Sequence, residues 1–198
     1  VSIAAHELLT PIAAAEGSLS LILDEHMGQV DKQADGYLRK VYASTHRLHA
    51  LVKDLLSVSR IEAGRTKFSP IEINVEQLIT DAIDQLQLVA KEKGLALAFQ
   101  KPAQPLPPAF ADPDKVTEVL INLIGNAIKY TPTGGVTVSA ESVSEKGKQQ
   151  IVVSVADTGL GMTKKAQEHL FEKFYRVSTP ETATIQGTGL GLYITRTI

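Results

Sequence analysis

Three residues near the start of the sequence, His6, Glu7 and Thr10, carry side chains that could do chemistry together. Apolar or small residues recur around them every three or four positions, and His6 falls about 100° away from that stripe, so its imidazole should face water. Pro11 has no N–H, so the helix should kink or loosen beside Glu7. An exposed imidazole next to a carboxylate can act as a nucleophile. A surface histidine near a helix start is the alternative, and these residues alone favour it.

Paired amides form a second group far downstream. Asn122 and Asn126 lie one helical turn apart and share a face with Glu118, and Lys129 is close to that face. An amide oxygen can ligate Mg²⁺ as a neutral donor, and a lysine beside it can neutralise phosphate charge. The alternative is that these asparagines only hydrogen-bond water, and without further context it is the simpler explanation.

Two glycine clusters follow the amides. Asp157 stands at a predicted strand end before Gly159 and Gly161. A carboxylate there can accept a hydrogen bond from an exocyclic amine, while the glycines let the backbone approach a flat ring. The stretch 187–191, Gly-Thr-Gly-Leu-Gly, opens a helix and presents backbone N–H groups to an anion. It is not a Walker loop, because no Lys-Ser/Thr follows, and its third glycine comes one position early for a dinucleotide fingerprint.

The elements that must position these residues begin with two long helices. Apolar stripes predict one helix from residue 1 to about 24 and a second from about 32 to 62, with a break near Gly28. Such an αα-hairpin buries its stripe on one side only, so two copies should pair into a four-helix bundle. His46 and His49 lie three positions apart on the second helix, but with no third ligand in view we expect no metal there.

The pattern changes after residue 66, where helices and strands mix. Asp112 followed by proline is a typical helix start and predicts a helix that runs to Tyr130. The other predicted elements are strand 68–73, helix 75–93, strand 95–99, an irregular proline-rich stretch 102–108, a hairpin of strands 136–143 and 150–156, a short helix 164–174 within a long loop, and a helix from 192.

Composition narrows the class of protein. The 198 residues are 43% apolar and carry a net charge of −2 with both signs interspersed, which gives no electrostatic basis for binding nucleic acid or an anionic membrane. There is no cysteine, which excludes disulfides and thiolate metal sites, and no long apolar run that could span a bilayer. Val1 opens directly inside a helical pattern, so we expect a cytoplasmic piece of a longer protein, with any membrane segment outside this chain.

Taken in order, the motifs resemble those of bacterial sensor histidine kinases. The matching stretches are the phospho-acceptor box at 6–11, the N box at 122–131, the G1 box at 157–162, the F box at 171–176 and the G2 box at 187–192. They follow the family's order and cover essentially the whole chain. The resemblance implies a dimerisation and histidine-phosphotransfer hairpin over residues 1–66. It also implies a catalytic domain over 67–198 with the two-layer α/β sandwich of gyrase-type ATPases, the Bergerat fold.

The resemblance implies a role for each matching residue. His6 would attack the γ-phosphate of ATP while Glu7 accepts the proton of the other ring nitrogen, and Thr10 would orient water when a phosphorylated partner is hydrolysed. Asn126 would hold Mg²⁺. The residues expected around the nucleotide are Asn122, Asn126, Lys129, Tyr130, Asp157, Gly159, Gly161, Arg176, Gly187, Thr188, Gly189, Leu190 and Gly191. The implied partners are a second copy of the chain and the receiver domain of a response regulator.

Asn122, Leu9 and the C-terminus at Ile198 affect which properties of the family this chain is expected to share. Gyrase-type and chaperone ATPases carry a water-activating glutamate where this chain has Asn122, and an amide cannot take that proton, so little ATP hydrolysis is expected. Glu118, one turn earlier, should be too remote to replace it. The family commonly has arginine in place of Leu9, and its ATP domain continues beyond the position of Ile198, so we expect an incomplete C-terminus. The alternatives are a phosphatase-only or pseudokinase nucleotide-binding module and a hydrolytic ATPase.

Overall fold

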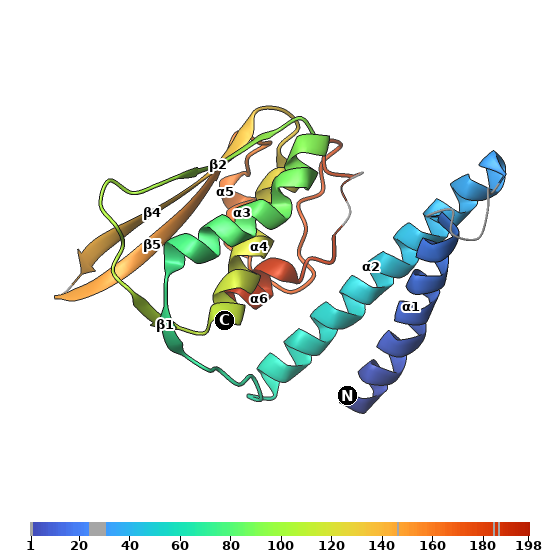
Figure 1. Ribbon diagram of the computed structural model, residues 1–198, viewed down its shortest axis with the longest axis horizontal. Coiled ribbons are helices and arrows are strands. Elements are labelled where there is room, and N and C mark those ends of the chain that lie inside the picture. The colour runs from blue at the N-terminus through green and yellow to red at the C-terminus, as the bar shows by residue number, and fades with distance from the viewer. Residues whose placement is uncertain (1, 24–30, 146, 184, 186) are drawn as a thin grey trace. The chain divides into compact units, whose positions relative to one another are not determined.

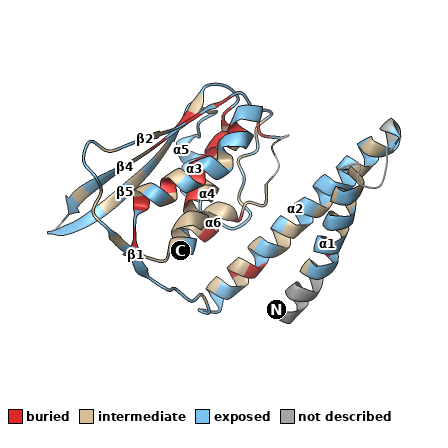
Figure 2. Cartoon of the chain, in the orientation of Figure 1, coloured by how far each residue is buried: buried red, intermediate tan, exposed pale blue. Residues whose placement is uncertain are grey.

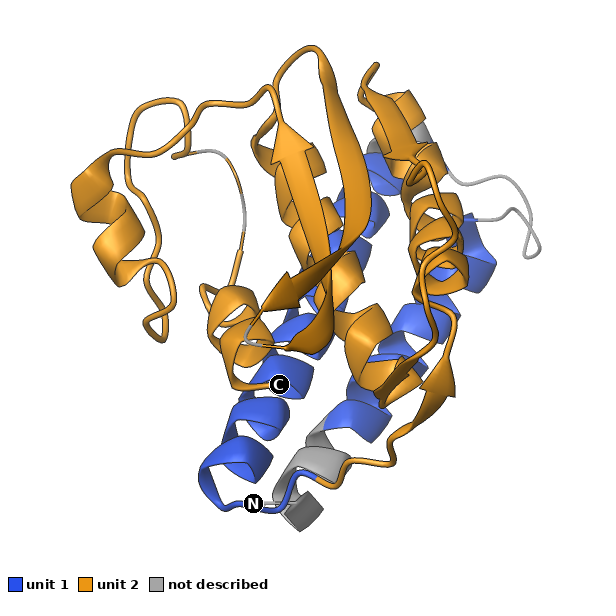
Figure 3. Ribbon diagram, turned by 90° about the vertical axis from the view of Figure 1, so that its left-hand side faces the viewer, with its two compact units in different colours: residues 1–66 blue, residues 67–198 orange. Residues whose placement is uncertain are grey.

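The computed structural model describes residues 2–23, 31–145, 147–183, 185 and 187–198, without the side chains of residues 2–8, 32 and 33. The chain divides into two compact units, residues 1–66 and residues 67–198, which Figure 3 draws in blue and orange. Within the described residues, no helix is both long and apolar enough to cross a membrane.

Unit 1 is a hairpin of two long helices, α1 (Ser2–Leu23) and α2 (Lys32–Glu62), which pack against each other (Figure 1). The bounds of α2 confirm those predicted from its apolar stripe. The helix α1 continues through Pro11, so the missing N–H does not end the helix there. Ile12, one residue later, is buried. The predicted break near Gly28 lies outside the described residues.

Glu16 links α1 to the two histidines of α2. Its Oε1 lies 3.3 Å from His46 Nδ1, and its Oε2 lies 3.0 Å from His49 Nδ1. Each imidazole therefore forms an ion pair with the carboxylate when it is protonated. In the part of the chain that the structure describes, no group of three or more His, Asp or Glu side chains is arranged to hold a metal ion. These three residues instead connect the helices of the hairpin.

Unit 2 is built on two small sheets. The larger has the strand order β2-β4-β5: β2 (Ala96–Gln100) runs parallel to β4 (Gly135–Glu145), and β4 forms an antiparallel hairpin with β5 (Lys148–Asp157). The smaller sheet pairs β1 (Ile71–Ile73) antiparallel with β3 (Ala109–Ala111).

Two helices cover one face of the larger sheet. The helices α3 (Val75–Glu92) and α4 (Pro113–Tyr130) pack against each other and against the strands, which confirms the predicted two-layer α/β sandwich (Figure 1). Two short helices, α5 (Lys164–His169) and α6 (Gly191–Thr197), follow β5. Burial on α3, α4 and the strands defines the core of the unit (Figure 2), whose members include Ile79, Ile83, Leu120, Ile124, Ile128, Val136, Val138 and Ala140.

Asp112 fixes the start of α4. Its Oδ1 accepts hydrogen bonds from the backbone N–H groups of Asp114 and Lys115, at 3.1 and 3.2 Å, which confirms the predicted N-cap. Its Oδ2 accepts from the backbone N–H of Ser69 at 2.8 Å, so the carboxylate also holds the segment before β1. The Ser69 hydrogen bond is the largest cause of the pKa of Asp112 lying below 3.8, and the two N-cap bonds also lower it.

Two predicted elements of unit 2 were wrong in extent, and one strand was missed. The strand predicted over 68–73 contains only Ile71–Ile73, because the Ser69 N–H is taken by Asp112. The helix predicted over 164–174 ends at His169, and beyond it Phe174 adopts a φ of 61° and donates its N–H to the Gly189 carbonyl. The strand β3 was not predicted, because its pairing partner lies far away in the sequence.

Candidate active site

The helix α4 carries paired amides on one face. Both Asn122 and Asn126 are half-buried. Asn122 Nδ2 donates to the Thr195 hydroxyl on α6 at 2.6 Å, and Asn126 Nδ2 donates to Asn122 Oδ1 at 3.4 Å. The amides are therefore oriented by hydrogen bonds within the protein, and they are not simply solvated surface residues.

Lys129 lies in the last turn of α4 and is half-buried. Its Nζ lies 5.3 Å from the centroid of the Tyr130 ring. Burial is the largest cause of the pKa of Lys129 lying below 10.5, and the positive charge of Arg176 lowers it further. Because two neighbouring cations repel each other, an anion placed beside both would be stabilised by both charges. The electrostatics of this site therefore suit a polyanionic ligand.

The glycine stretch 187–191 approaches the same face of α4. A Cβ atom on Gly191 would lie 2.3 Å from Asn122 Oδ1, and one on Gly187 would lie 2.6 Å from Lys129 Nζ. Any larger side chain at these positions would displace the amide or the lysine. The structure thus brings a glycine-rich backbone directly against Asn122 and Lys129, two of the residues that the resemblance places around the nucleotide.

Asp157 lies at the end of β5, next to the last turn of α4. Its Oδ1 accepts from the Gly159 N–H at 2.8 Å, and the Leu160 N–H donates to the Tyr130 carbonyl at 3.2 Å. Thr158 adds a third link, because its hydroxyl accepts from the Gly135 N–H at 3.0 Å. The Leu160 bond holds the predicted G1 stretch against the end of α4, and the Thr158 bond joins it to the start of β4.

The segment between α5 and α6 is closed by two contacts between its arms. The Phe174 N–H donates to the Gly189 carbonyl at 2.9 Å, and the Arg176 guanidinium donates to the Ile185 carbonyl. The hydroxyl of Thr188 accepts from the Leu190 N–H at 3.1 Å. Arg176, on the first arm, is in this way held near the glycines of the second arm and near Lys129.

Not all predicted site residues come together in the described geometry. Asn122, Asn126, Lys129, Arg176, Gly187 and Gly191 converge, with Tyr130, Asp157 and Gly159 beside them. Thr10 is exposed on α1, whereas the side chains of His6 and Glu7 lie outside the described residues. Their roles, and those of the nucleotide-site residues, stay predictions.

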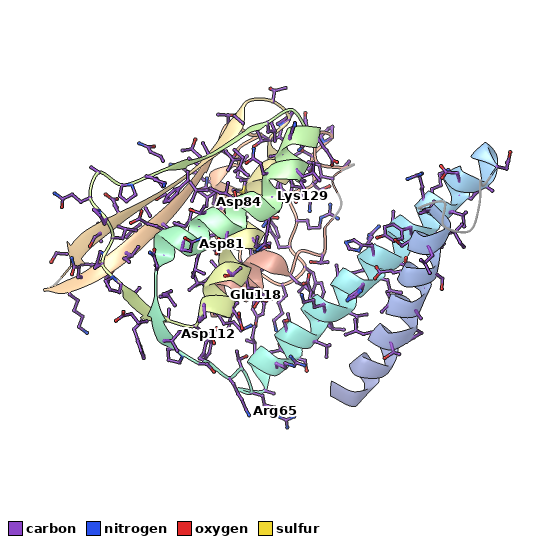
Figure 4. All side chains as sticks on the ribbon, in the orientation of Figure 1. Arg65, Asp81, Asp84, Asp112, Glu118 and Lys129 are labelled. Carbon is purple, nitrogen blue, oxygen red and sulfur yellow. The ribbon has the colours of Figure 1, made fainter. Side chains whose placement is uncertain are left out.

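Glu118, labelled in Figure 4, is the carboxylate of α4 that precedes Asn122 by one helical turn. Its Oε2 accepts from Lys115 Nζ at 2.6 Å. The carboxylate is thus held in an ion pair toward the start of the helix, away from the turn that carries Asn126 and Lys129. This geometry supports the expectation that Glu118 does not serve the site as a base.

Two residues with contacts to this site were missed in the sequence. Thr195 hydrogen-bonds to Asn122, and Lys93 Nζ donates to the carbonyls of Ile128 and Lys129 at 2.7 Å each. The Lys93 ammonium thereby satisfies carbonyls at the C-terminal end of α4, where a positive charge is favoured. No sequence signal marks either residue, because both act across a long separation in the chain.

The two units match two known domain families. Residues 1–64 match the family described as "His Kinase A (phospho-acceptor) domain", and residues 111–198 match the family described as "Histidine kinase-, DNA gyrase B-, and HSP90-like ATPase". The hairpin and the α/β sandwich therefore define a phospho-acceptor domain followed by an ATPase-type domain.

Individual relatives match the chain over nearly its whole length. The chain is 37% identical over 195 residues to the "Non-motile and phage-resistance protein" of Caulobacter vibrioides, covering 98% of this chain and 23% of that protein. It is 34% identical over 203 residues to the "Cell-division control histidine kinase PdhS" of Brucella anthropi, covering 96% and 19%. A crystal structure of full-length ShkA in complex with AMPPNP superposes with a TM-score of 0.78 at 30% identity, covering 99% of this chain and 39% of that one. The chain belongs to the sensor histidine kinases, and it spans about a fifth of the length of these curated relatives.

Proposed function

We propose that this chain is the ATP-dependent core of a sensor histidine kinase, which phosphorylates its own His6 and passes the phosphoryl group to an aspartate of a response-regulator receiver domain. The observation that carries the proposal is the half-buried Lys129, which lies near Arg176, in close contact with Gly187 and one helical turn from Asn126. Phosphoryl transfer depends mainly on positioning and on neutralising charge, and these residues offer both.

Each residue around the proposed nucleotide has a physical task. Lys129 and Arg176 would neutralise phosphate oxygens, and the backbone N–H groups of the stretch 187–191 would donate to them. The Asp157 carboxylate would accept a hydrogen bond from the adenine amine, beside the Gly159 backbone. Asn126 Oδ1 would be a protein ligand to Mg²⁺, which would supply positive charge against the phosphate groups when bound.

The transfer step would use an imidazole nitrogen of His6 as the nucleophile. A bond forms between that nitrogen and the γ-phosphorus, while the bond from the γ-phosphorus to the bridging oxygen breaks and ADP leaves with its electron pair. Glu7 takes the proton from the other ring nitrogen, so the imidazole ring of the phosphohistidine product carries no positive charge. In the second reaction the N–P bond breaks and a carboxylate oxygen of the receiver domain takes the phosphoryl group.

A homodimer formed through unit 1 is also part of the proposal. Val41, Leu48 and Leu55 recur every seven residues on α2 and are 50%, 48% and 54% exposed in the single chain. A stripe with this spacing is the pattern by which helices pair in a bundle. Packing of this stripe against a second copy would remove three large apolar side chains from water.

Incubation with γ-labelled ATP tests the proposal and separates its alternatives. We expect acid-labile, base-stable label on the protein, lost in His6→Gln and retained in the matched control His46→Gln on α2. Steady release of labelled phosphate without labelled protein would instead identify a hydrolytic ATPase. Nucleotide binding with neither label nor release would identify a pseudokinase or phosphatase-only module, in which Leu9 marks the loss of the kinase step.

A further inference from the structure

Thr195, on α6, begins a series of hydrogen bonds that ends at the proposed Mg²⁺ ligand. Its Oγ1 lies 2.6 Å from Asn122 Nδ2, and Asn122 Oδ1 lies 3.4 Å from Asn126 Nδ2. An amide nitrogen donates and does not accept, so the Thr195 hydroxyl is the acceptor of its bond. The three side chains thus connect α6 to Asn126 on α4.

The direction of these bonds decides which atom Asn126 offers to a cation. Because Asn126 Nδ2 is turned toward Asn122, Asn126 Oδ1 is turned away from it, and the oxygen is the amide atom that can ligate a metal. If both amides turned over, Asn122 Nδ2 would donate to Asn126 Oδ1. The cation would then compete with a protein donor for its ligand atom.

We propose that Thr195 is a positioning residue that holds Asn126 in the metal-binding orientation, an inference that rests on the proposed function above. When Asn126 Oδ1 binds the cation, Asn122 Nδ2 has to point at residue 195, where a hydroxyl accepts its hydrogen bond. A side chain without an acceptor would leave this half-buried N–H unpaired. An orphaned N–H costs more than an under-satisfied carbonyl, so loss of the hydroxyl favours the turned-over amides.

The approach of α6 that makes this contact depends on Gly191. A Cβ atom there would lie 2.3 Å from Asn122 Oδ1 and 3.1 Å from Asn122 Nδ2, so the helix can begin against Asn122 only because this residue is glycine. Thr195 follows one helical turn later and lies on the same face of α6. The glycine stretch therefore brings a hydrogen-bond acceptor, as well as its own backbone, to the paired amides.

The test measures how Mg²⁺ changes the affinity of the 198-residue chain for a non-hydrolysable ATP analogue, by calorimetry with increasing Mg²⁺ and with EDTA. Thr195→Val removes the acceptor at almost constant shape, and Thr195→Ser keeps the hydroxyl as the matched control. We expect Thr195→Val to raise the Mg²⁺ concentration for half-maximal effect by about tenfold, as expected for a residue that orients a metal ligand. Affinity in EDTA should stay close to that of the parent chain, and Thr195→Ser should behave like the parent in both conditions.

Two results would overturn the inference while the proposed function stands: an unchanged Mg²⁺ titration in Thr195→Val, or an equal loss of affinity with and without Mg²⁺, which would make Thr195 a structural residue only. A parent chain that binds the nucleotide but does not respond to Mg²⁺ would refute the metal assignment of Asn126 itself, and the inference with it. Thermal unfolding of each variant checks the fold. Thr195→Ala, which removes the hydroxyl without adding a methyl in its place, serves if the valine variant does not fold.

Discussion

Replacing Gly189 by alanine tests whether the two arms of the segment between α5 and α6 have to meet for nucleotide to bind. Gly189 has a φ of 73°, and its carbonyl accepts the Phe174 N–H at 2.9 Å. Gly94, after α3, has a similar φ of 71°, but a Cβ atom there would meet nothing within 4 Å. Gly94→Ala is therefore a control for backbone strain without steric contact.

The structure gives the size of the two effects. An L-residue in the left-handed region costs roughly 1–2 kcal/mol, and this applies to both variants. At position 189 the new Cβ would also lie 2.7 Å from the Phe174 carbonyl carbon, against about 3.5 Å for a comfortable contact, so the arms must separate by about 0.8 Å. That separation lengthens the hydrogen bond to Phe174 and moves Arg176 away from Lys129.

We expect Gly189→Ala to weaken binding of a fluorescent ATP analogue by at least about tenfold, since the strain and the lost contact together exceed about 1.4 kcal/mol. Gly94→Ala should bind like the parent chain, while its melting temperature falls by roughly 2–8 °C. If the two variants have the same nucleotide affinity, the contact between Phe174 and Gly189 does not serve the site and the argument is wrong.

Three more predictions concern pH and assembly. Burial and Arg176 lower the pKa of Lys129 in the free chain, and a bound polyanion would raise it again. Nucleotide binding should therefore take up protons at pH values near and above the lowered pKa, and should weaken as pH rises through that range. Calorimetry in two buffers of different ionisation heat measures this uptake, and its absence there would contradict the prediction. Leu48→Glu should convert a dimer to a monomer by light scattering, whereas Leu88→Glu, on the exposed face of α3, should not. Because the pKa of Asp112 is lowered in the folded state, its ionised carboxylate stabilises the fold fully above pH 3.8, and this stabilisation is lost as pH falls through the lowered pKa. Asp112→Ala should therefore have a lower melting temperature than the parent chain at neutral pH, and the two melting temperatures should converge in strong acid.

Elements specified by local chemistry were predictable from the sequence. The helix α2 follows a stripe that repeats every three or four residues, and α4 begins at an aspartate followed by proline, so both were located closely. The strand β3 is different, because Ala109–Ala111 has no periodicity of its own and becomes a strand only by pairing with Ile71–Ile73. The residues predicted to extend α5 likewise include one that bonds to a distant segment, because the Phe174 N–H donates to the Gly189 carbonyl.

The same division applies to the candidate site. The motif residues could be found because their types and spacing are unusual within a short window. The contacts between these residues could not be predicted, because they join segments far apart in the chain. They are the proximity of Lys129 to Arg176, the approach of Gly191 to Asn122 and the hydrogen bond from the Asn122 amide to the Thr195 hydroxyl. The contacts of Gly191 and Thr195 follow from the packing of α6 on α4, and that of Arg176 from the closure of the segment between α5 and α6. No local pattern encodes either arrangement.

The side chain at position 122 decides what the site can do with ATP. All residues of α4 are described, and its carboxylates are Asp114 and Glu118, of which Glu118 is paired with Lys115. Asn122 donates to Thr195 and accepts from Asn126, so both ends of its amide are hydrogen-bonded within the protein, and it has no group that could take a proton from water. A site that neutralises phosphate charge without a base nearby would lower the barrier for an incoming nucleophile but would not activate water. We therefore expect ATP to be hydrolysed only slowly when no imidazole is present to accept the phosphoryl group. The rate of phosphate release by His6→Gln, which should be low, checks this expectation.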